Sequence, residues 1–238
     1  MSESKVAAVL GVGPGLGAAI AHRFAREGFA VGLMARSEEK LTSLQTEIEK
    51  DGGTALSISA DATDPASVTL AFAQVQQKLG NPEIFVYNTG AFQMGGILEI
   101  TPEQFENNWK ANCFGAFLSA QQVLPVMVER GRGTILFTGA TASIKGSARF
   151  AGLAVGKFGL RALAQSLARE FGPQGIHVAH IIIDGMIDTS RVRGMAPDRE
   201  KQTLLSPEGI AETYWQLYLQ DPTAWTLELD LRPAVEKF

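Results

Sequence analysis

The sequence predicts a single α/β domain built on a parallel, doubly wound sheet of about seven strands, with helices on both faces. Three observations support this prediction. Short apolar runs alternate with amphipathic stretches along the chain, most of these runs are β-branched or uniformly apolar, and a glycine-rich turn follows the first run. Uniformly apolar strands are expected where helices cover both faces of a sheet. Right-handed crossovers then place a ligand crevice at the carboxyl ends of the strands.

Turn residues and helix start signals separate the expected strands. Asp64 and Ser206 each precede a proline, which is typical of an N-cap followed by the first helical residue. Thr101-Pro102-Glu103-Gln104 has capping-box spacing, and the helix that it opens runs towards Arg130, although Pro125 should end or kink it. The strands are expected at 6–10, 30–34, 55–60, 84–87, 134–137, 176–183 and 227–231.

The last expected strand has a different pattern. Leu227-Glu228-Leu229-Asp230-Leu231 alternates with period two, so one face is apolar and the other is charged. This alternation predicts an edge strand or a subunit contact. Arg232-Pro233 ends the strand, and the tail 234–238 packs either on a partner subunit or on its own chain.

Composition excludes several kinds of partner. With 238 residues, of which 45% are apolar, residues 1–238 can bury one sizeable core. The net charge of −4 offers no basic surface for nucleic acid or an anionic membrane. A single cysteine, Cys113, excludes an internal disulfide and a cysteine zinc cluster, so we expect a cytoplasmic protein without a metal site. We also expect no signal peptide and no stretch long enough to span a bilayer.

The glycine-rich turn indicates a nucleotide site. Gly11-Val12-Gly13-Pro14-Gly15-Leu16-Gly17 lies between the first strand and a helix, whose backbone N–H groups and positive dipole end suit a pyrophosphate. The second strand ends at Ala35-Arg36-Ser37, and a basic residue at this tip accommodates the 2′-phosphate of NADP(H). Arg36 therefore favours NADP(H) over NAD(H). In the alternative interpretation Arg36 is merely solvated, and Ser37 caps a helix that has Glu38 and Glu39 in its first turn.

Further segments follow the glycine turn in a recognisable order. Asp61-Ala62 ends the third strand, Tyr87-Asn88-Thr89-Gly90 ends the fourth, Asn112 lies in an N-x-x-G context on the long helix, Lys157 lies on a later helix, and Asp184-Gly185-Met186-Ile187-Asp188-Thr189 follows the sixth strand. With the G-x-x-x-G-x-G spacing of Gly11, Gly15 and Gly17, these segments resemble the short-chain dehydrogenase/reductase family, which has a Rossmann-type fold.

The resemblance implies a set of site residues. It gives Lys157 and Asn112 catalytic roles, and together with the glycine turn and Arg36 it implies an NADP(H) site. The residues expected at the cofactor are Gly11, Gly13, Gly15, Leu16, Gly17, Arg36, Ser37, Asp61, Ala62, Asn88, Gly90, Lys157, Gly185, Ile187 and Thr189.

Two catalytic positions depart from the pattern of the family. Leu153, four residues before Lys157, stands where the family has a tyrosine, and Ala140 stands where it has a serine. The nearest tyrosines are Tyr87, Tyr214 and Tyr218, none of which is expected near this helix. Because an alkoxide forms during carbonyl reduction, losing one proton-donating group costs about 10²–10⁴ in rate.

Three side chains are candidates for replacing the missing donor. Ser143 and Thr141 follow Ala140, although such hydroxyls more often satisfy local turns. Asp184 lies at the tip of the sixth strand, where it either supplies a proton or caps a turn. His177 and His180 are spaced to point to opposite faces of the sixth strand, so we expect two partly buried, hydrogen-bonded histidines and no shared metal. His22 is expected to be structural.

The sequence leaves two main hypotheses about function. The first is an NADP(H)-dependent oxidoreductase that acts on a small carbonyl or alcohol with altered proton transfer. The second is a catalytically silent NADP(H)-binding protein, either a sensor or a partner subunit, and different chemistry on the same scaffold also stays open. The segment 186–222 is expected to form a substrate lid. In it, Arg191, Arg193 and Met195 bind an acidic or polar substrate or form an exposed basic loop. The resemblance also implies a homodimer or homotetramer formed through the helices that begin near Thr101 and Ala148.

Overall fold

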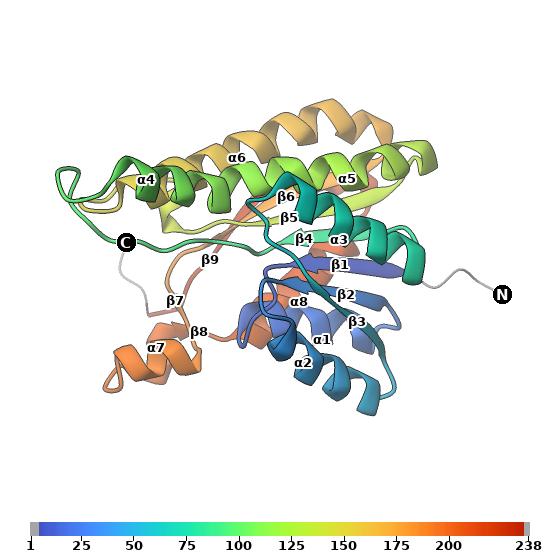
Figure 1. Ribbon diagram of the computed structural model, residues 1–238, viewed down its shortest axis with the longest axis horizontal. Helices are drawn as coiled ribbons and strands as arrows, with labels where there is room; N and C mark the ends of the chain where they lie inside the picture. The colour runs from blue at the N-terminus through green and yellow to red at the C-terminus, as the bar shows by residue number, and fades with distance from the viewer. Residues whose placement is uncertain (1–4, 236–238) are drawn as a thin grey trace.

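The predicted sheet is present in the structure, a computed structural model that describes residues 5–235. Seven parallel strands lie in the order β3-β2-β1-β4-β5-β6-β9, which confirms the predicted α/β fold (Figure 1). The strands are β1 (Val6–Leu10), β2 (Ala30–Ala35), β3 (Thr54–Ser59), β4 (Ile84–Tyr87), β5 (Gly133–Thr138), β6 (Ile176–Ile183) and β9 (Glu228–Leu231). A separate pair is formed by β7 (Met186–Ile187) and β8 (Leu204–Leu205).

Helices cover both faces of the sheet, as its apolar strands require. One face packs against α1 (Leu16–Arg26), α2 (Glu38–Lys50) and α8 (Pro207–Tyr218). The other packs against α3 (Pro65–Lys78), α5 (Gly115–Arg130) and α6 (Ala151–Phe171), as Figure 1 shows. The remaining elements are α4 (Pro102–Trp109), η1 (Lys110–Phe114), η2 (Thr141–Ser143), η3 (Gly172–Gln174), α7 (Ser190–Met195), η4 (Lys201–Thr203) and η5 (Pro222–Ala224).

The predicted helix caps are present. Asp64 accepts a hydrogen bond from the Ala66 N–H (3.0 Å), and Ser206 accepts one from Gly209 (3.2 Å). Thr101 forms a complete capping box with Gln104. The long helix does not end at Pro125, however, since this residue is exposed inside α5 and the carbonyl left without a donor is open to water. The irregularity in this helix lies earlier, in the π-helical turn η1.

The stretch Pro102–Arg130 corrects the expectation that no stretch is long enough to span a bilayer. Within the part of the chain that the structure describes, it is long and apolar enough, by length and composition, to cross a membrane. Its α5 portion packs through Ala116, Ala120 and Val123 into the core beneath the sheet. The stretch therefore has the contacts of a core helix.

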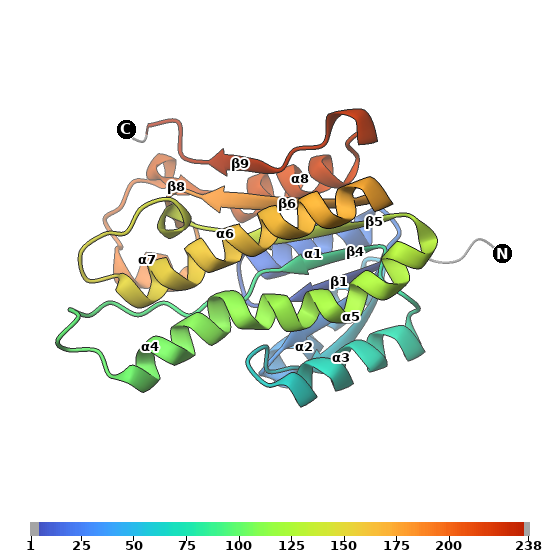
Figure 2. The ribbon, with the colours of Figure 1, turned by 90° about the horizontal axis from the view of Figure 1, so that it is seen from above.

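The alternating last strand lies at an edge of the sheet, as predicted. β9 pairs with β6, and Figure 2 shows it beside β6 along one border of the molecule. Leu229 and Leu231 pack on the core of the α8 face. Glu228, on the other side of the strand, accepts hydrogen bonds from the Arg161 Nε and Nη2, each at 2.8 Å. The sequence predicts a packing contact for the tail 234–238, of which residues 236–238 lie outside the described residues.

Candidate active site

The glycine turn is held against the end of β4. A Cβ on Gly11, whose φ is +99°, would lie 2.5 Å from the backbone of Asn88 and Thr89, so only glycine fits here. The Asn88 Nδ2 donates to the Gly11 carbonyl (2.9 Å). A Cβ on Gly17 would lie 2.7 Å from that same carbonyl oxygen. These close approaches fix the entry to α1.

The turn leaves an open cradle in front of the α1 N-terminus. No side chain caps this helix, and no acidic residue lies in its first turn. A Cβ on Gly13 would meet no atom within 4 Å, whereas a Cβ on Gly15 would lie 2.7 Å from the Thr189 Cγ2. The glycine turn and the segment after β7 therefore border the same space, which an anion at the helix terminus would fit.

The tips of β2 and β3 carry the next predicted residues. Arg36 is exposed, and its guanidinium has no hydrogen bond or ion pair to any residue in the described range 5–235. Ser37 occupies the N-cap position of α2 without a side-chain cap bond, so the capping alternative gains no hydrogen bond. Asp61 accepts hydrogen bonds from the Thr63 N–H (2.9 Å) and hydroxyl (2.8 Å). Ala62 is buried beside it.

Lys157 and Asn112 converge on Gly90, at the end of β4. A Cβ on Gly90 would lie 3.1 Å from the Asn112 Oδ1 and 3.6 Å from the Lys157 Nζ. Asn112 lies in the π-helical turn η1, and its Nδ2 donates to the carbonyls of Ala91 (3.0 Å) and Asn108 (2.9 Å). Its buried Oδ1 has no partner within the described residues. The two side chains therefore present polar groups to one small space.

The Lys157 ammonium is held at the end of β5. Its Nζ donates to the Thr138 carbonyl at 2.8 Å, and burial lowers the pKa of Lys157 to about 8. Desolvation has this effect because it disfavours the charged form of an amine. The same strand end carries the Thr138 hydroxyl, which lies 2.7 Å from the Tyr214 Oη.

Tyr214 is not expected near α6, and it lies on α8, which packs against the opposite face of the sheet. It is fully buried on α8, and burial raises its pKa above the ordinary value. No signal in the sequence places it beside β5, because 76 residues separate it from Thr138. Since its hydroxyl is engaged and buried, Tyr214 cannot reach a ligand in the crevice.

Ser143 turns inward and does not face the crevice. Its side chain is fully buried, and its Oγ accepts a hydrogen bond from the Ala140 N–H (3.1 Å) and lies 3.2 Å from the His180 Nε2. The expectation that Ser143 could supply a proton to a substrate is therefore not supported by its position. The local-turn interpretation describes it correctly.

The two histidines of β6 are more deeply buried than expected. The His177 Nε2 lies 2.9 Å from the Thr226 carbonyl, and its ring stacks on Trp225. His180 packs under Gly139, whose Cβ would lie 2.4 Å from the imidazole ring. Burial, and then the positive charge of Lys157, lower the pKa of His180 to about 4. The His22 Nε2 lies 3.6 Å from the Glu47 Oε2 on the surface.

His180 is expected to make the protein acid-sensitive. Because its pKa is about 4 in the folded state and near 6.5 otherwise, the unfolded chain binds the extra proton between these values, so stability falls as the pH drops from 6.5 to 4. The loss is about 3 kcal/mol at most. The free energy of unfolding of wild type and of His180→Asn, measured with urea, should therefore differ by an amount that shrinks by this value from pH 7 to pH 4, and the surface variant His22→Gln is measured beside them for comparison. A difference that is independent of pH would contradict the depressed pKa.

Asp184 is tied to two other segments. The Thr141 hydroxyl donates to the Asp184 Oδ1 (2.5 Å), and the Arg232 guanidinium lies 3.6 Å from the Asp184 Oδ2. Arg232 also pairs with Asp230. Sequence reasoning did not identify Arg232 as part of the site, because nothing local to Arg232-Pro233 indicates that β9 ends beside β6.

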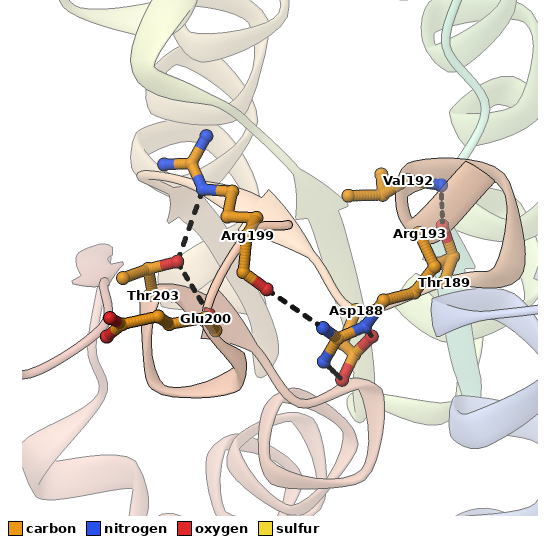
Figure 3. A network of polar contacts seen from close by, with 7 residues as sticks. All are labelled: Asp188, Thr189, Val192, Arg193, Arg199, Glu200 and Thr203. Atoms are coloured by element: carbon orange, nitrogen blue, oxygen red, sulfur yellow. Dashed lines mark hydrogen bonds and ion pairs between the residues drawn. The ribbon is translucent and has the colours of Figure 1, made fainter. Parts of the chain in front are cut away.

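The segment after β7 neutralises one of its own arginines. Arg193 donates to both carboxylate oxygens of Asp188 (2.7 and 2.8 Å) and to the Arg199 carbonyl (3.1 Å). Figure 3 shows this network, with Thr189 capping α7 by accepting a hydrogen bond from the Val192 N–H. The expectation that Arg193 binds an acidic substrate is therefore not supported, because its guanidinium is already paired with a carboxylate.

The fold and these contacts define a Rossmann-like α/β protein with its glycine turn at the first crossover. A family model described as short chain dehydrogenase matches residues 5–200. The chain therefore belongs to the short-chain dehydrogenase family.

Individual relatives agree with this assignment. A short-chain dehydrogenase/reductase from Armillaria gallica is 35% identical over 215 residues, covering 89% of this chain and 80% of that protein. The crystal structure of a short-chain dehydrogenase from Rhodopseudomonas palustris is 40% identical, with a TM-score of 0.84 and coverage of 96% and 98% of the two chains. An alcohol dehydrogenase from Thermococcus sibiricus, solved with 5-hydroxy-NADP, is 26% identical with a TM-score of 0.89, and the match covers 99% of both chains. An oxidoreductase of this type is supported, and a silent binding protein is not favoured.

Proposed function

We propose that the protein is an NADP(H)-dependent oxidoreductase that acts on a small carbonyl or alcohol substrate with altered proton-transfer residues. The observation that carries this proposal is the convergence of the Lys157 Nζ and the Asn112 Oδ1 on Gly90. Gly90 lies two residues beyond Asn88, which holds the glycine turn through Gly11. One short segment at the end of β4 thus joins a cradle for a dinucleotide to a pair of buried polar groups.

The residues present fit a dinucleotide. The uncapped α1 N-terminus and the glycines of the turn would hold the pyrophosphate. Arg36 and Ser37 would contact the 2′-phosphate, and Asp61 and Ala62 would border the adenine. Gly185, Ile187 and Thr189 would face the nicotinamide, and Lys157 would hold its ribose. The cofactor, when bound, supplies or accepts the hydride.

The proton-transfer groups differ from those that the family pattern implies. Leu153 is half-buried on α6 and Ala140 is half-buried after β5, and neither can donate or accept a proton at its side chain. We infer that they replace the tyrosine and serine of the family. Lys157 and Asn112 would then keep their positions while proton transfer is carried by another group.

Exposed apolar side chains support the proposed self-association through α4, α5 and α6. Trp109, Phe117, Val155 and Phe158 on these helices are all more than one-third exposed. Large apolar side chains gathered on helices in this way are typical of interfaces. A homodimer or homotetramer would cover them.

The test of the proposed function has two parts. The purified protein is titrated with NADPH and with NADH. Consumption of the reduced cofactor is then followed with a panel of aldehydes, ketones and quinones, and its formation from NADP+ is followed with the corresponding alcohols. NADPH binding followed by turnover with at least one carbonyl or alcohol supports the proposal. Binding without any turnover would overturn the enzymatic part of it, and the absence of binding would overturn the whole.

Replacing Arg36 tests the choice of cofactor. Because a charged hydrogen bond to a phosphate contributes about 1.5–3 kcal/mol, Arg36→Ala should raise the Kd of NADPH about 10- to 100-fold. The Kd of NADH should change much less, and isothermal titration measures both. Arg26→Ala is a matched control, since Arg26 is also exposed but lies at the far end of α1. An equal rise in the Kd of NADPH and of NADH would contradict a role of Arg36 at the 2′-phosphate.

A further inference from the structure

Three hydroxyls lie close to Ala140 in the sequence, those of Thr138, Thr141 and Ser143, and only Thr141 among them is not a buried residue. The Thr138 hydroxyl is buried against Tyr214 (2.7 Å), and Ser143 is fully buried against Ala140 and His180. Thr141, in contrast, is half-buried. It follows directly on Ala140, in the loop anchored by the hydrogen bond from the Lys157 Nζ to the Thr138 carbonyl.

The hydrogen of this hydroxyl is already committed. The Thr141 Oγ1 donates to the Asp184 Oδ1 at 2.5 Å, and an ionised carboxylate can only accept. The Arg232 guanidinium, 3.6 Å from the other carboxylate oxygen, compensates the charge of Asp184. A hydroxyl has one hydrogen and two lone pairs. What Thr141 still offers to a ligand is therefore acceptor capacity.

The position of Asp184 places this acceptor beside the segment expected at the nicotinamide. Asp184 directly precedes Gly185, where a Cβ would lie 2.9 Å from Leu205 and 3.2 Å from Pro233. Close packing against β8 and the residues after β9 thus fixes the backbone next to Asp184. The segment after β6, strand β8 and the residues after β9 are distant in sequence, and together they hold the Thr141 hydroxyl oxygen in a defined orientation.

We propose that Thr141, oriented by Asp184 and Arg232, binds the substrate oxygen as a hydrogen-bond acceptor, so that the site binds alcohols in preference to matched carbonyl compounds. This inference rests on the proposed function and specifies its substrate class. An alcohol can donate its O–H to the Thr141 Oγ1. A carbonyl oxygen at the same place would face another acceptor without a hydrogen between them, which costs a factor of about 10 to 100 in affinity.

Unreactive probes allow the preference to be measured as binding, without turnover. We would titrate 1-methylcyclohexanol against cyclohexanone, and 2-phenyl-2-propanol against acetophenone, by calorimetry. Tertiary alcohols have no carbinol hydrogen, and ketones do not react with the oxidised cofactor. Each pair is measured with NADP+ present and again without cofactor. The alcohol of a pair should bind about 10-fold or more tightly than its ketone.

Three variants identify the group responsible. Thr141→Val should weaken alcohol binding about 10-fold and strengthen ketone binding, because it removes the acceptor that the ketone oxygen would face, whereas Thr141→Ser should retain the preference for the alcohol. Asp184→Asn should narrow or reverse the preference for the alcohol. The asparagine amide N–H can donate to the Thr141 Oγ1, which frees the hydroxyl hydrogen of Thr141 to bond to a ketone. Thr223→Val is the matched control, since the Thr223 hydroxyl donates to Asp221 (2.6 Å) in an exposed turn. Circular dichroism and thermal melting verify that each variant folds. If Asp184→Asn does not fold, the comparison of Thr141→Val with Thr141→Ser decides the question.

Equal affinities within each pair, or no binding of either pair at millimolar concentration, would overturn the inference. So would a Thr141→Val variant that changes only stability. These outcomes are separable from failure of the proposed function, which is judged by NADPH titration and by turnover of carbonyls and alcohols. The measurements without cofactor assess the preference even if NADPH does not bind.

Discussion

Replacing Lys157 with methionine is expected to lower kcat/KM at least 100-fold, since it removes the cation buried beside Gly90 and Asn112. The same change should stabilise the fold at neutral pH. The pKa of Lys157 falls from 10.5 to about 8 on burial, which corresponds to about 3 kcal/mol of penalty for the charged form. Loss of the hydrogen bond to the Thr138 carbonyl opposes this gain by about 1 kcal/mol. The expected net gain at pH 7 is therefore about 2 kcal/mol.

The pH dependence of this gain has a definite sign. Between pH 8 and pH 10.5 the unfolded chain holds the lysine proton and the folded chain does not, so the stability of wild type rises with pH across this window. The advantage of Lys157→Met should accordingly fade as the pH rises, in urea unfolding at pH 7, 9 and 10.5. Lys145→Met is the control, because Lys145 is exposed on the loop after η2. Unchanged kcat/KM in Lys157→Met would exclude the proposed role, and a gain that does not vary with pH would contradict the lowered pKa.

Restoring the two missing hydroxyls should produce the second large effect. We expect the double variant Ala140→Ser with Leu153→Tyr to raise kcat for carbonyl reduction about 10²–10⁴-fold, the factor that one positioned proton donor typically contributes. Leu153 lies one helical turn before Lys157 on α6, so a tyrosine there would lie on the same helix face as the buried ammonium. A nearby cation would favour its phenolate form.

Single variants separate the contributions, which need not be additive because the groups act together. Leu153→Tyr alone should recover more than Ala140→Ser alone, since only the phenol replaces the proton donor. Ser166→Tyr is the matched control, because Ser166 is exposed on the same helix and is not one of the side chains proposed for the subunit interface. If the double variant binds NADPH and folds but gains no activity, the substrate site has diverged from the family together with these two residues.

Much of the fold could be predicted because its signals are local. The caps at Asp64, Thr101 and Ser206 each involve residues within three positions of one another. The alternation of 227–231 likewise predicts an edge strand from neighbouring residues. Pro125 shows the limit of such rules, because the helix continues through it where the freed carbonyl is open to water.

The candidate site could be predicted only in part. The glycine turn, Asn88, Gly90, Asn112 and Lys157 belong to ordered motifs, and the structure brings them together. The roles of individual polar groups could not be predicted, because they depend on partners supplied by distant segments. Arg193, for which the sequence left open a substrate contact or an exposed basic loop, pairs with Asp188. Ser143, for which it left open proton donation or a local turn bond, is buried and bonded to Ala140 and lies against His180.

The sequence by itself determined the parallel sheet, its helical layers and the place of the glycine turn, because periodicity and capping are properties of neighbouring residues. It also determined that Leu153 and Ala140 carry no hydroxyl. Only the tertiary structure decided which hydroxyl near Ala140 stays accessible. Thr141 meets Asp184 across 43 residues, and Thr138 meets Tyr214 across 76. Which atoms donate, accept or are buried follows from packing between strands and helices that the chain order alone does not place side by side.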